Sequence, residues 1–65
     1  MKFVIEITRG ADPEATVVHR SIIDAISPKW AKSTAATLLK AWKHKGADGI
    51  RIINHSGQEI YRWRE

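Results

Sequence analysis

The stretch from Ser27 to Gly46, SPKWAKSTAATLLKAWKHKG, decides the fold, because both of its ends carry helix signals. The Ser27 hydroxyl can accept a hydrogen bond from a backbone N–H one turn further on. Pro28 suits the first helical position, where no N–H is needed, and Gly46 can adopt the left-handed conformation that closes a helix. The sequence therefore predicts a single helix over residues 28–45.

This helix has an apolar half and a positive half when its residues are placed about 100° apart. The apolar half holds Trp30, Ala31, Thr34, Ala35, Leu38, Leu39, Ala41 and Trp42. The other half holds Lys29, Lys32, Lys40, Lys43 and His44, with no Asp or Glu between Pro28 and Lys45. We expect the apolar half to pack on a core, with either Trp30 or Trp42 at its rim, and the lysines to face water.

The composition indicates one small domain over residues 1–65, in which 43% hydrophobic residues and three Trp suffice for a compact core. The 11 Lys and Arg exceed the 7 Asp and Glu, which favours polyanionic or acidic partners, although solubility alone also explains a net charge of +4. The lack of Cys suits a reducing compartment, and no apolar run is long enough to span a membrane. The N-terminal segment lacks the pattern of a signal peptide. We therefore expect a cytoplasmic protein without membrane contact.

The N-terminal third predicts two strands. Residues 2–9 alternate strictly, with Phe3, Ile5 and Ile7 on one face and Lys2, Val4, Glu6 and Thr8 on the other. Residues 10–14, GADPE, form a turn. Residues 16–25, TVVHRSIIDA, are rich in β-branched residues and favour a strand that pairs back on the first. The alternative is a helix capped by Asp12, started by Pro13 and extending to Ile26.

The C-terminal third predicts a hairpin with strands over residues 50–54 and 59–63. A three-residue loop, His55-Ser56-Gly57, would direct Ile50, Ile52 and Ile60 to the core and direct Arg51, Ile53, Tyr61 and Trp63 away from it. A two-residue loop, Ser56-Gly57, would instead place Tyr61 and Trp63 on the face of Ile50 and Ile52, with Arg51 opposite Arg62. We favour the three-residue loop. The fold expected is α+β, ββαββ, an antiparallel sheet packed on one face by a single long helix, with βααββ as the alternative.

Nothing in the sequence indicates catalysis. His19, His44 and His55 fall in three different elements, and no carboxylate pair or metal-ligand spacing occurs. Ser21 lies two residues from His19, but a nucleophile and base also need a third group that orients them. We expect no enzyme activity, metal or cofactor.

Two groups of residues are candidates for binding nucleic acid or a protein partner. The first is the lysine face, Lys29, Lys32, Lys40 and Lys43, whose ammonium groups could follow a phosphate backbone, although a solvated helix face and a helix C-terminus also favour cations. The second is an aromatic and basic patch on the last hairpin, formed by Arg51, Tyr61 and Trp63. Arg51, Arg62 and Arg64 are also candidates to extend the contact made by the lysine face. The alternative to a binding role for this patch is that Trp63 covers the sheet edge or packs at a homodimer interface.

The run RSIIDAISPKWAK, residues 20–32, and the later run G-x-R-I-I-N-x-S-G-Q-E-I, residues 49–60, resemble the layout of short phage and prophage proteins. In these proteins a strand ends at a small residue, Ser or Ser-Pro caps a helix, and a closing hairpin follows. Some small anti-CRISPR inhibitors are similar. The resemblance implies docking on a nucleoprotein complex, but its motifs are capping and turn signals and assign no functional residue. The chain is basic and is unlike a DNA mimic.

The function expected is a non-catalytic binding module that contacts nucleic acid or a nucleoprotein through the lysine face. The alternative is a protein-interaction module, such as an inhibitor of a host defence complex or a homodimer, that uses a sheet face or an edge strand.

Overall fold

The structure is a computed structural model that describes residues 1–11 and 13–65. Its elements in chain order are β1 (Lys2–Arg9), β2 (Thr16–Asp24), α1 (Pro28–Trp42), the 3₁₀ helix η1 (Lys43–Lys45), β3 (Gly49–Asn54) and β4 (Glu59–Arg64). The ββαββ prediction is confirmed. The segment after the first turn is a strand, so the helical alternative and the βααββ order are wrong. Asp12, predicted in the turn or as a helix cap, lies outside the described residues.

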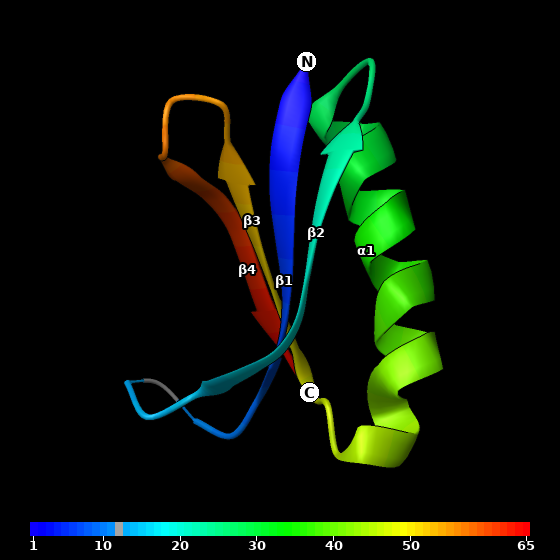
Figure 1. The fold of residues 1–65 in the computed structure, drawn as a ribbon, viewed down its shortest axis with the longest axis vertical. Coiled ribbons are helices and arrows are strands. Elements are labelled where there is room, and N and C mark those ends of the chain that lie inside the picture. The colour runs from blue at the N-terminus through cyan, green and yellow to red at the C-terminus, as the bar shows by residue number, and fades with distance from the viewer. Residues whose placement is uncertain (12) are drawn as a thin grey trace.

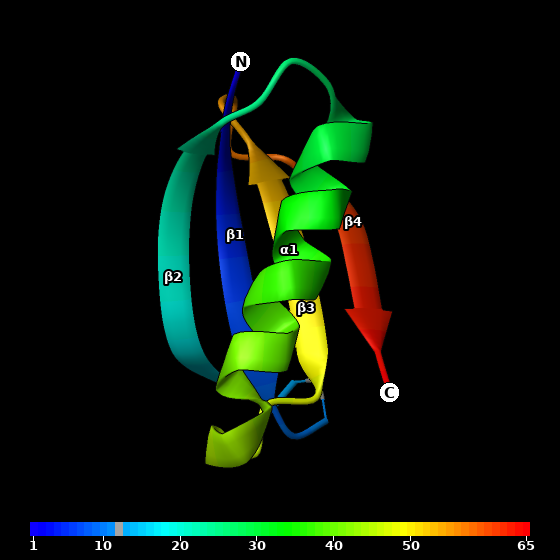
Figure 2. The same cartoon turned by 90° about the vertical axis from the view of Figure 1, so that its right-hand side faces the viewer.

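The four strands form one antiparallel sheet in the order β2-β1-β3-β4. The β1–β2 and β3–β4 hairpins lie side by side, so β1 and β3 are the central strands and β2 and β4 are the edge strands. Helix α1 covers one face of this sheet, and the other face carries no second layer among the described residues (Figure 1). Figure 2 shows the helix in front of β1 and β3, with β2 and β4 to either side. This placement creates a helix side and an open side.

The predicted helix ends are confirmed. The Ser27 side chain accepts a hydrogen bond from the Trp30 backbone N–H, with 3.4 Å between nitrogen and oxygen, and Pro28 opens the helix. Gly46 has φ +82° and donates its N–H to the Lys43 carbonyl at 2.9 Å. The cap and the left-handed glycine thus fix the length of the helix and so the position of its lysines.

The core lies between α1 and the central strands. Its buried members are Phe3, Ile5, Ile7, Ala31, Ala35, Leu39, Ala47, Ile50 and Ile52. The alanines face the sheet and let the helix approach closely, since they present only a methyl group. Trp42 packs against the edge of this core, whereas Trp30 is 57% exposed, so the expectation that one of the two lies at the rim is confirmed.

The β3–β4 hairpin combines the predicted loop with an unpredicted register. The Gly57 N–H donates to the Asn54 carbonyl at 2.9 Å and Gly57 has φ +81°, as the three-residue loop requires. However, Ile52 pairs with Tyr61 while Ile53 pairs with Glu59, so the register shifts at Ile60. Such a β-bulge inserts one extra residue and moves everything after it to the opposite face.

The predicted facing of this hairpin is therefore wrong for three residues. Tyr61 and Trp63 lie on the helix side, where they pair with Ile52 and Ile50, and Ile60 is partly exposed instead of buried in the core. The facing matches the one expected of a two-residue loop, with Arg51 opposite Arg62, although the loop itself has three.

The helices of the described residues are all too short or too polar to cross a membrane.

Candidate binding groove and the open side of the sheet

A groove runs between α1 and β4 on the helix side. Its volume is about 250 Å³, and it is lined by Lys32, Ala36, Leu39, Lys40, Lys43, Ile50, Tyr61, Trp63 and Glu65. Leu39 and Ile50 belong to the buried core, and the aromatic rings of β4 form one wall while the lysines of α1 form the other. The bulge at Ile60 creates this groove, because without it Tyr61 and Trp63 would face away from the helix.

The structure thus brings together two groups that the sequence places apart. Three of the four candidate lysines line the same groove as the candidate aromatic residues. The Lys32 ammonium lies 4.6 Å from the centre of the Tyr61 ring, a cation–π contact. Trp63 is 41% exposed and so offers a ring face to a ligand.

The other three candidate lysines differ in their surroundings from Lys32. Lys43 forms an ion pair with the Glu65 carboxylate at one end of the groove. Lys40 has no ion pair with any residue of the described ranges, 1–11 and 13–65, and neither has Lys29, which lies beyond the groove beside Trp30 and Ser33. Within the described residues, three of the four candidate lysines therefore have no carboxylate partner, and Lys43 alone is neutralised by one.

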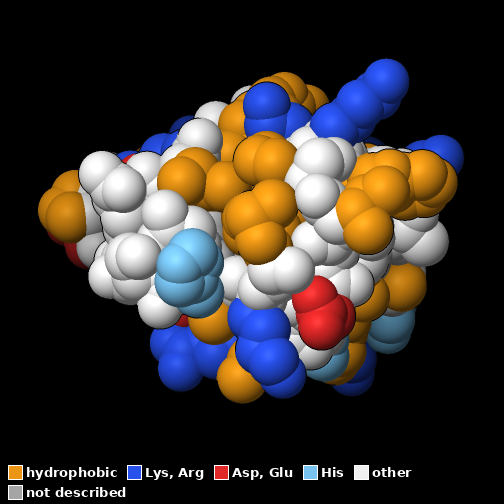
Figure 3. Space-filling model, turned by 90° about the horizontal axis from the view of Figure 1, so that it is seen from above, with side chains coloured by type: hydrophobic (Ala, Val, Ile, Leu, Met, Phe, Trp, Pro, Cys, Tyr) orange, Lys and Arg blue, Asp and Glu red, His pale blue; other side chains and the backbone are white. Residues whose placement is uncertain are grey.

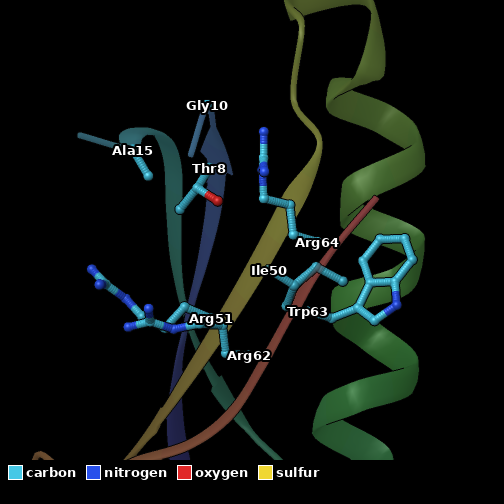
Figure 4. A pocket seen from close by; sticks show the side chains of 8 residues that line it. All are labelled: Thr8, Gly10, Ala15, Ile50, Arg51, Arg62, Trp63 and Arg64. Carbon is cyan, nitrogen blue, oxygen red and sulfur yellow. The ribbon is translucent and has the colours of Figure 1, made fainter. Parts of the chain in front are cut away.

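Arg51, which was predicted in the aromatic patch, and the candidate Arg62 both lie on the other side of the sheet. Figure 4 shows the Trp63 ring on the side of β4 that faces α1 and the Arg51 and Arg62 side chains on the opposite side. The single patch of Arg51, Tyr61 and Trp63 is therefore a wrong prediction. The cavity between Thr8, Gly10 and these arginines has a volume of only about 20 Å³, which is enough for a water molecule.

Sequence reasoning missed an ion-pair cluster at the centre of the open side. The Glu6 side chain is only 3% exposed. Its Oε2 accepts hydrogen bonds from Arg20 Nε at 3.1 Å and Nη2 at 2.7 Å, and its Oε1 accepts from Arg51 Nε at 2.7 Å and from Arg51 Nη2. The available signal was the charged Glu6 among the alternating residues of β1. The sequence alone does not show that Arg20 and Arg51 are its neighbours on the adjacent strands.

Burial raises the pKa of Glu6, but the hydrogen bonds and charges of Arg51 and Arg20 outweigh it. The pKa of Glu6 therefore lies below its ordinary value, and the carboxylate is ionised at neutral pH. Glu59 continues the cluster: it pairs with Arg62 at 2.7 Å and lies 3.7 Å from Arg51.

Within the described residues, the histidines belong to no group of three or more side chains that could hold a metal ion. His19 Nε2 lies 2.9 Å from Ser21 Oγ, and the His19 ring stacks on Trp42 with the ring centres 4.7 Å apart. These contacts cover the edge of the core beside β2.

The end of the molecule where α1 begins exposes further apolar side chains, among them Met1, Ile26 and Trp30. Figure 3 looks onto this end and shows hydrophobic side chains spread across it, with Lys and Arg around them. A shallow hollow lies between Ile26 and Trp30, next to Asp24.

Comparison of this chain with known protein families, curated proteins and solved structures found no match.

Proposed function

We propose that this protein binds single-stranded nucleic acid in the groove between α1 and β4. The observation that carries the proposal is the presence, in one groove, of two aromatic rings on β4 and three lysines of α1, Lys32, Lys40 and Lys43. Proteins that hold single strands combine cations for the phosphates with aromatic rings for the bases, because every base has a face that can stack. A duplex hides its base faces, and its phosphates alone would make no use of the rings.

The charges and the rings have separate tasks in this arrangement. Lys29 and Lys40, which have no ion pair within the described residues, contact phosphates and supply affinity without sequence preference. Trp63 stacks on a base. The Lys32 ammonium, which lies over the Tyr61 ring, is placed between the phosphate contacts of the lysines and the base contact of Trp63. The ion pair of Lys43 with Glu65 opens when a phosphate replaces the carboxylate.

The first test is titration of the purified chain with a fluorescent oligothymidylate over a series of salt concentrations. Two or three lysine–phosphate contacts predict a slope of log K against log salt of about −1.5 to −2, at about −0.7 for each phosphate of a single strand. The double variant Lys29→Glu with Lys40→Glu should abolish binding and keep the circular dichroism spectrum of the native chain. An affinity that changes neither with the salt concentration nor in the double variant would contradict the proposal.

The second test separates stacking from charge. Trp63→Ala should weaken oligothymidylate binding by about tenfold, since one stacked base contributes about 1–3 kcal/mol, and should leave the salt slope unchanged. Trp30→Ala is the matched control, because Trp30 is similarly exposed but lies outside the groove. Equal losses in the two variants would show that Trp63 has no special part in binding.

A further inference from the structure

The open side of the sheet is ordered in rows that cross the strands. One row consists of Arg20, Glu6, Arg51 and Arg62, which are direct partners across β2, β1, β3 and β4. The next row holds three aliphatic residues, Ile22, Val4 and Ile53, and ends in Glu59 on β4, beyond the bulge. A charged row and a row that is aliphatic on β2, β1 and β3 (the aliphatic row) therefore lie side by side on a face that no other layer covers in the described part of the chain (Figure 1).

Glu6 holds two of these arginines in fixed positions. Each guanidinium donates two N–H bonds to one carboxylate oxygen, through Nε and Nη2. A guanidinium has five N–H donors, so donors remain on Arg20 and Arg51 that do not point at Glu6. The Arg20 side chain is 63% exposed, and its outer edge is open to a ligand.

This arrangement lowers the cost of covering the face. Glu6 is already removed from water and compensated, so a partner would not have to desolvate it. Arg20 and Arg51 are already ordered, so little side-chain entropy is lost when they bind. A preordered guanidinium selects planar oxyanions, which accept two parallel N–H bonds.

The aliphatic row determines which kind of oxyanion fits. Ile22 is 69% exposed, beside the half-buried Val4 and Ile53. A phosphate backbone has no apolar group to cover these side chains, and the aromatic rings of β4 lie on the other side of the sheet. A second copy of this chain would offer no unpaired carboxylate from these two rows, because Glu6 and Glu59 already accept hydrogen bonds from arginines of their own chain.

We infer that the open side docks a protein segment in which aliphatic side chains lie next to carboxylates. The aliphatic side chains of the partner cover Ile22 and Val4, and a carboxylate of the partner binds the outer edge of Arg20. This site is on the opposite side of the sheet from the groove, so the two can be occupied at the same time.

The test is selection of a random dodecapeptide library on the immobilised full chain, followed by affinity measurement of the selected peptides. The expected peptides combine Asp or Glu with Ile, Leu or Val. Ile22→Asp should weaken their binding at least about tenfold, since it removes an exposed apolar contact and repels carboxylates. Ile26→Asp is the matched control: Ile26 is equally apolar and even more exposed, but it lies outside the open side, so affinity should stay within about twofold.

A lysine variant distinguishes the open side from the groove, because acidic peptides would also be attracted to lysines. Peptides bound on the open side should bind Lys29→Glu with Lys40→Glu with nearly unchanged affinity. The inference is overturned if that variant loses the peptides while Ile22→Asp keeps them, or if the library yields only basic peptides or none. It is also overturned if sedimentation shows a dimer that Ile22→Asp dissociates. Ile22→Ser replaces Ile22→Asp if the latter does not fold, as judged by circular dichroism.

Discussion

Ile5 and Glu6 are neighbours in β1 and are equally hidden from water, but the two sides of the sheet hide them by different means. Ile5 is covered by α1 and packs with Ile52, so apolar contact stabilises it. No second layer of the described residues lies above Glu6, and the guanidinium groups of Arg20 and Arg51 cover it instead. The comparison teaches that burial on the open side depends on charge, whereas burial on the helix side does not.

The largest effect should come from the helix side. Ile5→Ala leaves a cavity under α1 and should lower the free energy of unfolding by about 2–5 kcal/mol. A domain of this size has a stability of only about 3–5 kcal/mol, so much of the variant should be unfolded at room temperature. Urea denaturation followed by circular dichroism measures the loss. Ile22→Ala, on the exposed surface of the open side, is the control, and a similar loss there would contradict the difference between the sides.

The next largest effect should come from the centre of the open side. Glu6→Gln keeps the shape of the side chain but removes the charge that both arginines bind. We expect a loss of about 1–3 kcal/mol in the free energy of unfolding, smaller than for Ile5→Ala because Arg20 and Arg51 can regain water. Urea denaturation again provides the measurement. Glu59→Gln is the control, because Glu59 accepts arginine bonds in a more exposed position. If the free energy of unfolding falls equally in both variants, the burial of Glu6 does not increase the contribution of its ion pairs to stability.

The helix side could be predicted largely from the sequence, because its signals are local. The cap at Ser27, the proline after it and the glycine at 46 fix the helix, and strict alternation fixes the buried face of β1. The facing of Tyr61 and Trp63 could not be predicted, since a bulge changes the register without changing the residues that form the strand. The sequence therefore does not predict the groove between α1 and β4, although five of its nine lining residues are candidate site residues.

The ion-pair cluster could not be predicted for a related reason. Arg20 and Arg51 are 14 and 45 residues away from Glu6 in the chain, and only the pairing register brings them together. The alternation of β1 says that Glu6 faces away from the helix, but it does not say whether water or guanidinium groups cover it. Sequence patterns describe each strand, whereas this cluster is a property of three adjacent strands.

An acid titration tests the same cluster with a smaller expected effect, because protonated Glu6 can still accept an arginine hydrogen bond. The pKa of Glu6 is lower in the folded chain than the ordinary 4.5 expected on unfolding. The ionised group therefore stabilises the fold at neutral pH, and this stabilisation should be lost as the pH falls below about 4.5 toward the folded pKa. Urea denaturation at a series of pH values measures the slope.

Glu6→Gln should flatten this acid dependence without abolishing it. Asp24 contributes as well, because the hydrogen bond and charge of the N-terminal ammonium hold the pKa of its carboxyl below the usual value. The double variant Glu6→Gln with Asp24→Asn should be flatter still. An unchanged slope in Glu6→Gln would mean that the buried carboxylate is not the group that titrates with folding.

The smallest effect should come from the ion pair on the helix side, which completes the comparison. Lys43 and Glu65 are 50% and 42% exposed, so water screens their attraction. Lys43→Gln should therefore change the free energy of unfolding by at most about 1 kcal/mol, and added salt should remove the difference. Because this pair is weak, a phosphate can displace Glu65 at little cost, and Glu65→Gln should tighten oligothymidylate binding severalfold. A loss as large as that of Glu6→Gln would show that Lys43 is fixed to Glu65 and is not available to a ligand.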